Sequence, residues 1–333
     1  SPESVKNNVW TIGSAQAYAA QWAGAAIGLP RAQALASGRG ITVAVLDTGI
    51  DLAHPALAGR LLPGRDFVDG DADPSDTAQP SQAGYGHGTH VAGLVAWVAP
   101  GARILPLRVL DADGQGDAWV LAEAMLHAID PDGNPATADG AKVINLSLAG
   151  LAPSQLMRTV DQLVNCNLIA PEDAPDPLVD TSDAGYNDDR QRCAAQGGAV
   201  VVAGAGNDGS SSLRTWPAAE SAYGLIPVAA SNAKGRLAAF SNSGNWIDLA
   251  APGDLVTSAV PGGGYATWSG TSMATPLVSG AAALVRERFP QLAPRDVARC
   301  LVASGDRLSG SRLPQVDVAA ALTRLAADPR RCR

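Results

Sequence analysis

Residues 41–49 of the chain read ITVAVLDTG, and this stretch decides the fold. A short run dominated by β-branched and aliphatic side chains, closed by an acid and a glycine, is typical of a strand buried on both faces of a parallel sheet. Runs of the same kind recur along the chain at residues 104–109, 142–146, 199–203 and 225–229.

The segments between these runs are long enough for crossover helices, for example at residues 118–129 and 154–164. Alternating strands and helices predict an α/β fold with a doubly wound, mostly parallel sheet and helices on both faces. No break in composition marks a linker, so we expect a single domain over residues 1–333. Residues 66–86 and 165–196 are irregular, and we expect surface loops there, the second being an insertion.

Composition excludes several classes of function. The chain has 333 residues, of which 46% are hydrophobic and 17% charged, as in globular proteins. Its net charge is −8, which provides no counterion-release term for binding a polyanion, so we expect no nucleic-acid partner. No stretch reaches the roughly 18 apolar residues of a spanning helix, so we expect no membrane partner either.

The chain has four cysteines, at positions 166, 193, 300 and 332, without a C-x-x-C spacing. This spacing disfavours zinc and permits three disulfide pairings. We predict the pairs Cys166–Cys193 and Cys300–Cys332, each closing a loop of about 30 residues and contributing roughly 3–4 kcal/mol in the chain-entropy model. Disulfides would imply an oxidising compartment. The alternative is four buried free thiols.

Ligand sites in open α/β sheets lie beyond the carboxyl ends of the strands, so polar residues that follow apolar runs are candidates. Asp47 closes the first run. Alone, it could be a turn former or a helix cap. An aspartic protease also presents a carboxylate in an Asp-Thr-Gly sequence, but it needs a second one, which this chain could supply only as a homodimer.

Three further candidates follow in the sequence. His87 and His90 lie three residues apart, and each could be a structural histidine, a metal ligand or a base, although two ligands make a poor zinc site. Asn207 lies among glycines and could simply form a turn. Ser272 precedes a predicted helix at residues 277–289, where a serine is usually an N-cap.

Taken together, these four motifs resemble those of the subtilisin-like serine proteases, the subtilases. The sequences D-T-G-I, H-G-T-H-V-A-G, G-N-D-G and G-T-S-M-A-T-P occur in that family's order, Asp, His, Asn, Ser. The resemblance covers roughly residues 15–290, apart from the 165–196 segment, and leaves the last 40 residues outside. It implies a serine endopeptidase that needs no cofactor for catalysis.

The resemblance assigns a role to each motif. Ser272 would be the nucleophile, His87 its general base and Asp47 the carboxylate that orients the imidazole. The side-chain amide of Asn207 and the backbone N–H of Ser272 would stabilise the oxyanion. His90 then becomes a structural residue.

In the family, a substrate pairs as an extended strand between two edge segments of the enzyme. The pocket for the residue before the scissile bond would have small, apolar walls, so we predict broad specificity with a preference for apolar residues. The predicted substrate-binding residues are Gly114, Gln115, Gly116, Ser147, Leu148, Ala149, Gly150, Ala205 and Gly206.

The chain departs from the family pattern in places. Ala149 replaces a usual glycine and would narrow the pocket mouth, and Leu277 replaces a histidine outside the triad. Ala56 replaces an acid of one calcium site, which we expect to be absent. Ala118 stands where many relatives carry a bulky aromatic residue, so a more distant subsite should be open.

A different calcium site is predicted in the acidic loop that precedes His87. Clustered carboxylates in a loop rich in glycine and proline suit a hard cation, and the segment resembles a calcium loop of thermitase-like members of the family. The alternative is a solvated acidic loop. The predicted ligands are Asp66, Asp69, Asp71 and Asp73.

The combined interpretation is a secreted, extracellular, monomeric serine endopeptidase that acts on proteins or peptides. Because the chain begins at Ser1, we expect a processed zymogen whose N-terminal pro-segment, implied by the family resemblance, has been removed. Two alternatives remain at this point. One is a binding module that kept the fold without turnover, and the other is a peptide ligase in which an amine rather than water resolves the acyl-enzyme. An aspartic protease and a zinc hydrolase are less favoured.

Overall fold

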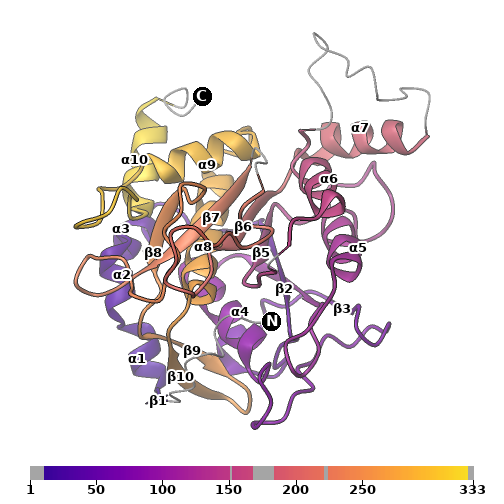
Figure 1. Ribbon diagram of the computed structural model, residues 1–333. Coiled ribbons are helices and arrows are strands. Elements are labelled where there is room, and N and C mark those ends of the chain that lie inside the picture. Colours follow the sequence, from indigo (N-terminus) through magenta and orange to yellow (C-terminus); the bar gives the residue numbers. More distant parts are fainter. Residues whose placement is uncertain (1–10, 151, 168–183, 221–223, 329–333) are drawn as a thin grey trace.

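A seven-stranded parallel sheet forms the centre of the computed structural model, which describes residues 11–150, 152–167, 184–220 and 224–328 (Figure 1). All neighbouring strands in it run parallel. The five predicted strands are all present, and the doubly wound α/β fold is confirmed. In spatial order the strands are β3 (Arg65–Asp66), β4 (Arg103–Arg108), β2 (Thr42–Asp47), β5 (Val143–Leu146), β6 (Val200–Gly204), β7 (Leu225–Ser231) and β8 (Leu249–Pro252).

The alternation of side chains along each strand divides the core into two layers. Val43 and Val45 of β2 belong to one buried cluster, which includes residues of α4 (His87–Val98) and α8 (Thr271–Arg288). Ala44 and Leu46 belong to the opposite cluster. That second cluster contains buried residues of α5 (Ala118–Ile129) and α6 (Gln155–Val164), which lie side by side at the right of Figure 1.

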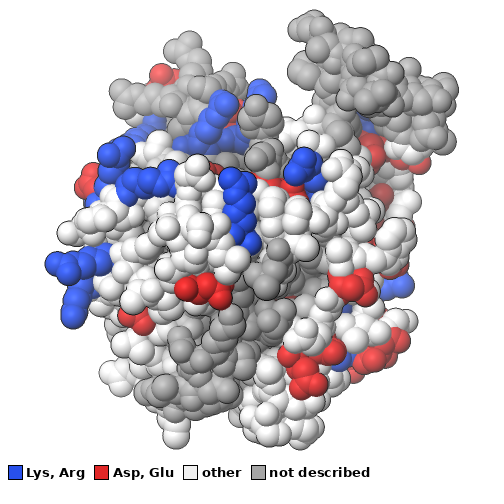
Figure 2. Space-filling view, in the orientation of Figure 1, with Lys and Arg blue, Asp and Glu red and all other residues white. Residues whose placement is uncertain are grey.

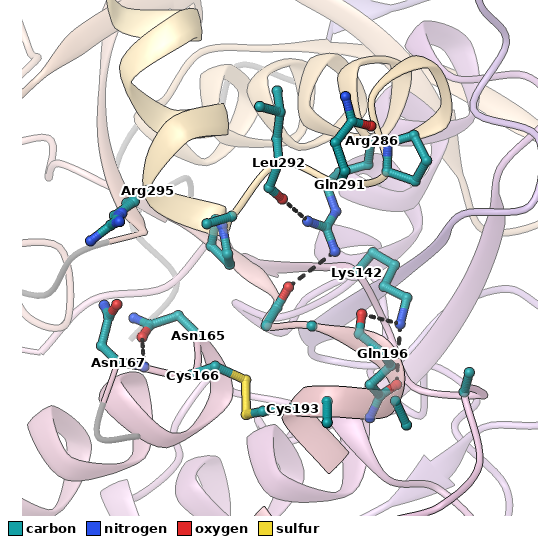
Figure 3. Close-up of a pocket in the computed structure, with 18 of the residues that line it drawn as sticks. Lys142, Asn165, Cys166, Asn167, Cys193, Gln196, Arg286, Gln291, Leu292 and Arg295 are labelled. Carbon is teal, nitrogen blue, oxygen red and sulfur yellow. Dashed lines mark hydrogen bonds between the residues drawn. A yellow bond between two sulfur atoms is a disulfide. The ribbon is translucent and has the colours of Figure 1, made fainter. Parts of the chain in front are cut away.

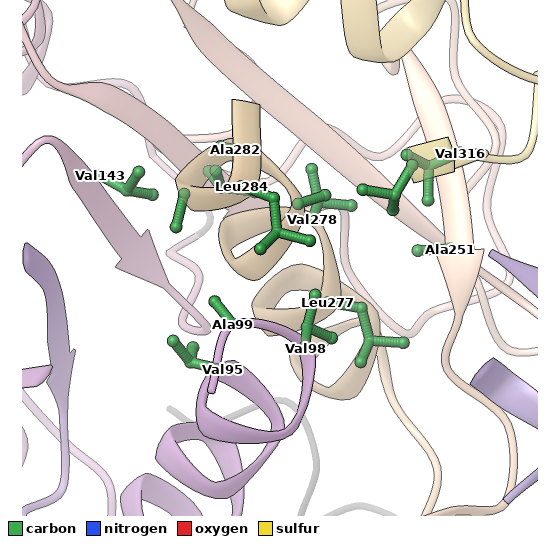
Figure 4. Packing of buried hydrophobic residues seen from close by; sticks show 14 of the residues in the cluster. Val95, Val98, Ala99, Val143, Ala251, Leu277, Val278, Ala282, Leu284 and Val316 are labelled. Atoms are coloured by element: carbon green, nitrogen blue, oxygen red, sulfur yellow. The ribbon is translucent and has the colours of Figure 1, made fainter. Parts of the chain in front are cut away.

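The helices α4 and α8 are in close contact on one face of the sheet, as Figure 4 shows for Val98 of α4 beside Leu277 of α8. A Cβ atom at Gly280 would lie 2.5 Å from Cβ of Val98, so only glycine permits this approach. The contact matters for function because each of these helices begins at a predicted catalytic motif.

The remaining elements are a small antiparallel sheet and further helices. The antiparallel sheet of three strands lies beside the central sheet, with β10 between the other two. Its strands are β1 (Thr11–Ile12), β9 (Val256–Val260) and β10 (Gly264–Trp268). The other helices are α1 (Ala15–Ala19), α2 (Trp22–Ala26), α3 (Leu29–Gln33), the 3-10 turn η2 (Pro55–Leu57), α7 (Ala184–Gln196), α9 (Pro294–Val302) and α10 (Val318–Ala327).

Two predictions about local structure were wrong. Residues 165–196 are not wholly irregular, because α7 occupies the C-terminal part of that segment. The helix predicted at residues 277–289 begins six residues earlier, at Thr271, and contains Pro276 in its interior. A proline usually marks a helix start, and the reason for this exception lies in the active site described below.

Charge is unevenly distributed over the surface. On the face shown in Figure 2, lysine and arginine side chains gather in the upper half, and acidic side chains gather toward the lower right. Parts of this face are therefore basic although the chain as a whole has a net charge of −8.

Candidate active site

The carboxyl end of β2 and the first residue of α4 bring Asp47 and His87 into contact. Nδ1 of His87 lies 2.6 Å from Oδ1 of Asp47, and both side chains are buried. The backbone N–H of Thr48 donates a second hydrogen bond to the same carboxylate oxygen, over 2.8 Å. A Cβ atom at Gly88 would lie 2.1 Å from the carbonyl oxygen of Gly49, so this glycine lets the start of α4 approach the D-T-G turn.

Ser272 lies in the first turn of α8, beyond the carboxyl end of the sheet, and is buried. Its hydroxyl donates to the backbone carbonyl of Ser147 over 3.2 Å. Nε2 of His87 is buried and has no hydrogen-bond partner within the described part of the chain. The structure thus joins Asp47 to His87, and it does not join His87 to Ser272.

A second contact between the same two segments explains why α8 tolerates Pro276. A proline has no N–H, so in a helix it leaves the carbonyl four residues earlier without its usual donor. Here that carbonyl belongs to Ser272, and the hydroxyl of Ser147 donates to it over 3.0 Å. The serine after β5 therefore completes the helix that carries the predicted nucleophile.

The hydroxyl of Ser147 is itself held by a buried polar chain that was not predicted. Asn145 donates from Nδ2 to Ser147 over 3.0 Å, and Ser279 of α8 donates to Oδ1 of Asn145 over 2.8 Å. All three side chains are fully buried. The polar interruption of the apolar run at residues 142–146 was the one signal in the sequence that could have indicated this chain.

Asn207 follows β6 and contacts the start of α8. Its Oδ1 accepts a hydrogen bond from the backbone N–H of Thr271 over 2.8 Å, so it satisfies one of the first N–H groups of the helix. With the oxygen engaged in this way, Nδ2 is the donor end of the amide. Asn207 and Ser272 therefore lie at the same end of α8.

The turn before Asn207 is held by two residues that sequence reasoning missed. The carbonyl of Ala205 accepts hydrogen bonds from Oγ1 of Thr215, over 2.8 Å, and from Nδ2 of Asn242, over 3.0 Å. Thr215 and Asn242 are buried. No local pattern indicates them, because they are close to the turn only in the folded chain.

The two predicted substrate segments lie near each other and border a cavity of about 160 Å³. Gly150 is paired with Trp216 through two backbone hydrogen bonds of 2.8 and 2.9 Å. Residues of both segments and of the adjacent helices line the cavity, and most of its side chains are apolar. The lining includes Gly116, Ala118, Leu121, Leu148, Ala149, Met157 and Trp216.

His90 has the surroundings of a structural residue. Its ring stacks on Trp268 with 4.5 Å between the ring centroids and 4° between the planes, and Nε2 lies 3.2 Å from the carbonyl oxygen of Ala266. Complete burial lowers the pKa of His90 to about 3, so the ring is neutral near pH 7.

The acidic loop makes its own network of charges. Nη1 of Arg108, which is buried, donates to Oδ2 of Asp66 and, over 2.6 Å, to Oδ2 of Asp69. Asp71 and Asp73 each accept backbone N–H groups of the loop, at 2.8 and 3.1 Å. The oxygen chemistry suits calcium, and the guanidinium already neutralises part of the charge at two of the four predicted ligands.

Another acidic cluster was not predicted as a metal site. Among the described residues, only Asp130, Asp132 and Asp139 bring three carboxylate, imidazole or thiolate ligand atoms within 4.8 Å of one another. Asp132 accepts a hydrogen bond from the backbone N–H of Asn134 and so also shapes this loop.

Cys166 and Cys193 form a disulfide bond that links the end of α6 to α7, with 6.0 Å between their Cα atoms. Cys300 in α9 is also disulfide-bonded. Its predicted partner, Cys332, lies outside the described residues. Over the part of the chain that the structure describes, no helix is long and apolar enough to span a membrane.

Comparison with known proteins gives a consistent result. The model of the subtilase family matches residues 38–317. A thermophilic serine proteinase of Bacillus sp. (strain AK1) is 36% identical over 282 residues, covering 82% of this chain and 58% of that protein. Thermitase of Thermoactinomyces vulgaris is 34% identical over 293 residues, covering 85% and 87% respectively.

Solved structures agree with the sequence comparison. A protease from Pseudoalteromonas arctica superimposes with a TM-score of 0.69 at 29% identity, covering 90% of this chain and 94% of that one. A cold-adapted subtilisin-like serine proteinase gives a TM-score of 0.64 at 29% identity, covering 84% and 88%.

Proposed function

The chain belongs to the subtilase family of serine endopeptidases, and we propose that it hydrolyses peptide bonds through an acyl-enzyme formed on Ser272. The observation that carries this proposal is the buried 2.6 Å contact between Asp47 and His87 at the edge of the sheet where α8 presents Ser272. A carboxylate that accepts Nδ1–H keeps Nε2 unprotonated, and an unprotonated Nε2 is what a general base requires.

The proposed reaction begins when the hydroxyl of Ser272 rotates from the carbonyl of Ser147 toward Nε2 of His87. The Ser272 oxygen then attacks the substrate carbonyl while His87 takes its proton, and His87 later gives that proton to the leaving amine. Asp47 stabilises the imidazolium in between. Water resolves the ester in a second round that uses the same residues.

Nδ2 of Asn207 and the backbone N–H of Ser272 are the proposed donors to the oxyanion. The N–H groups in the first turn of a helix have no partner within the helix, and the helix dipole there favours negative charge. The hydrogen bond between Oδ1 of Asn207 and Thr271 supports this role because it fixes which end of the amide is the donor.

We propose broad specificity with a preference for apolar residues. Main-chain pairing with residues 114–116 and 147–150 would give affinity without reading side chains. The cavity beside Ala118 has mostly apolar walls, which supports an open subsite for an apolar residue upstream of the scissile bond. The primary pocket, bounded by Ala149, Ala205 and Gly206, would bind the side chain of the residue before the scissile bond.

The wider setting is also a proposal. The disulfide between Cys166 and Cys193 supports secretion into an oxidising compartment. We propose a monomeric single-domain enzyme made as a zymogen. We also propose a calcium ion on the acidic loop, where the carboxylates of Asp66, Asp69, Asp71 and Asp73 would supply oxygen ligands. Catalysis itself draws only on side chains and backbone groups of the protein.

The decisive experiment is hydrolysis of a chromogenic peptide with an apolar residue before the scissile bond. Ser272→Ala should lower kcat about 10⁶-fold, a magnitude known from a subtilisin and therefore borrowed from the same family. Ser231→Ala, which alters another buried serine, should retain full activity. Mass spectrometry should detect a covalent adduct of a serine-directed inhibitor on the parent and none on Ser272→Ala. Full activity of Ser272→Ala would refute the assignment, and aminolysis in preference to hydrolysis would identify a ligase.

A further inference from the structure

A feature that the proposed function does not explain is a cavity of about 890 Å³ at the edge of the sheet opposite the active site (Figure 3). The catalytic groups follow the carboxyl ends of the strands. In contrast, Ile41, Lys142 and Gly198 line this cavity, and each lies just before the amino end of a strand, β2, β5 or β6. The remaining walls come from the end of α7, the Cys166–Cys193 disulfide and the segment leading into α9.

The charged side chains in the described lining of this cavity are all basic, namely Lys142, Arg286 and Arg295. Lys142 donates from Nζ to the backbone and side-chain oxygens of Gln196, over 2.9 and 3.2 Å. Arg286, which is 3% exposed, donates to the backbone carbonyls of Leu292 and Gly198. Every one of these acceptors is neutral.

Neither Lys142 nor Arg286 forms an ion pair within 4 Å with another described residue. Burying a charge without a counter-charge is costly. The cost shows in their titration: burial, followed by the neighbouring charge of Arg286, lowers the pKa of Lys142 to about 8, and burial lowers the pKa of Arg286.

Asn165 adds a third observation that is independent of charge. It is 2% exposed and lines the cavity, and its Oδ1 accepts from the backbone N–H of Asn167 over 3.1 Å. Its Nδ2 is buried and has no hydrogen-bond partner within the described ranges. An amide donor left unsatisfied in the interior usually marks a missing acceptor.

Unused donors therefore surround this cavity. A lysine offers three N–H groups and an arginine five, and the hydrogen bonds to Gln196, Leu292 and Gly198 use two on each side chain. We propose that the cavity is a binding site for a small multivalent oxyanion, phosphate or sulfate, held by Lys142, Arg286 and Nδ2 of Asn165. Such a ligand supplies a negative charge, which the described lining of the cavity lacks, and acceptors for these donors.

Bound there, the anion would connect parts of the chain that are far apart in sequence. Asn165 follows α6, Lys142 immediately precedes β5, and Arg286 lies in the last turn of α8. The expected effect is therefore on stability rather than on turnover, because Arg286 lies about 21 Å along α8 from Ser272 at 1.5 Å per residue. The proposal does not depend on the catalytic mechanism.

The test measures the melting temperature of an inhibitor-blocked sample against inorganic phosphate, sulfate, citrate and chloride at constant ionic strength. A ligand that binds only the folded state raises the melting temperature in a saturable way. We expect saturable increases of several degrees with phosphate or sulfate and none with chloride. Lys142→Gln should abolish the increase, and Lys234→Gln, the same exchange at an exposed lysine, should retain it.

A second variant protects the test against loss of folding. Asn165→Asp keeps the shape of the side chain and places a negative charge where the anion would bind. It should raise the melting temperature in chloride and remove the response to phosphate. A phosphate response that persists unchanged in Lys142→Gln and Asn165→Asp, a response to citrate alone, or no saturable response in the parent would overturn the proposal.

Discussion

The proposed triad and the basic cavity, which lie at opposite edges of the central sheet, leave opposite kinds of hydrogen-bonding capacity unused. In the proposed triad the buried atoms without a partner among described residues are acceptors, Oδ2 of Asp47 and Nε2 of His87. In the cavity at the amino edge the unpartnered atom is a donor, Nδ2 of Asn165, and it lies in the same lining as Lys142 and Arg286, which form no ion pair with described residues. The kind of unpaired group indicates what each site can bind. Unpaired acceptors in the triad can take up a proton, whereas unpaired donors in the cavity can bind an anion.

The same helix serves both edges. Ser272 lies in the first turn of α8, where helix N–H groups and the dipole favour negative charge, and Arg286 lies in the last turn, where backbone carbonyls favour a cation. The polarity of the backbone thus agrees with the side chains at each end. Changes at one edge should therefore leave the other edge unaffected.

The largest effect is expected from Asp47→Asn. An asparagine can donate to Nδ1 of His87, which would favour the tautomer with a proton on Nε2 and so remove the general base. We expect kcat to fall about 10⁴-fold, the size of effect seen when a triad carboxylate becomes an amide. Steady-state hydrolysis of the chromogenic peptide measures it.

Phosphate should raise the melting temperature of Asp47→Asn as much as that of the parent, because the anion cavity lies at the other edge. A loss of kcat below tenfold would mean that Asp47 does not control the imidazole. A lost phosphate response would mean that the two edges are not independent.

A smaller catalytic effect is expected from Asn207→Ala, which removes an oxyanion donor but leaves the triad intact. We expect kcat to fall about 10²–10³-fold with KM nearly unchanged, a magnitude measured on the equivalent donor of a subtilisin and borrowed here. Asp208→Ala is a neighbouring control whose side chain was assigned no part in the reaction. A change in KM alone would contradict the oxyanion role.

The catalytic edge was largely predictable from the sequence because its residues follow strands or begin helices within short local patterns. Asp47, His87, Asn207 and Ser272 each belong to such a pattern, and the strand ends bring them to one edge. The anion cavity was not predictable. Lys142, Asn165 and Arg286 come from separate segments, and nothing near each of them in the sequence indicates the others.

Two local errors have the same origin. The early start of α8 depends on the hydroxyl of Ser147, which completes the hydrogen bonding that Pro276 removes, and 125 residues separate Ser147 from the carbonyl of Ser272 that it supports. The helix α7 carries Cys193, whose bond to Cys166 ties it to α6. In both cases a contact between distant segments outweighs the local preference for a break or a loop.

The polar chain beneath Ser272 should contribute to stability in a measurable way. Ser279→Ala leaves the buried Oδ1 of Asn145 without its side-chain donor, so we expect the free energy of unfolding to fall by about 1–3 kcal/mol. Urea unfolding of inhibitor-blocked protein measures this change. Ser231→Ala is the matched control because that hydroxyl is fully buried and has no partner among the described residues, so its loss should cost almost nothing.

Equal destabilisation by Ser279→Ala and Ser231→Ala would show that the loss of any buried hydroxyl has the same cost. In that case the chain from Ser279 to Ser147 would have no special importance. A loss of stability confined to Ser279→Ala would show that the hydrogen bond from Ser279 to Asn145 stabilises the segment that holds Ser272. Ser279 lies in α8 between the proposed nucleophile and the anion cavity.

The smallest effect is expected from calcium at the acidic loop of the catalytic edge. Because Arg108 already neutralises part of the charge of Asp66 and Asp69, an ion there would relieve mainly the repulsion that involves Asp71 and Asp73. We therefore expect a chelator to lower the melting temperature by only about 2 °C, which for a chain of this size corresponds to roughly 1 kcal/mol. Thermal unfolding with calcium and with chelator measures it.

Two isosteric variants locate that ion. Asp71→Asn should abolish the calcium dependence if the acidic loop binds the ion, and Asp132→Asn should preserve it. The reverse result would assign calcium to the cluster of Asp130, Asp132 and Asp139, where three carboxylates already lie within 4.8 Å of one another without an arginine among them. In either case the phosphate response should not change, because neither acidic loop contributes an aspartate to the described lining of the anion cavity. A phosphate response altered by Asp71→Asn would contradict the separation of the two edges.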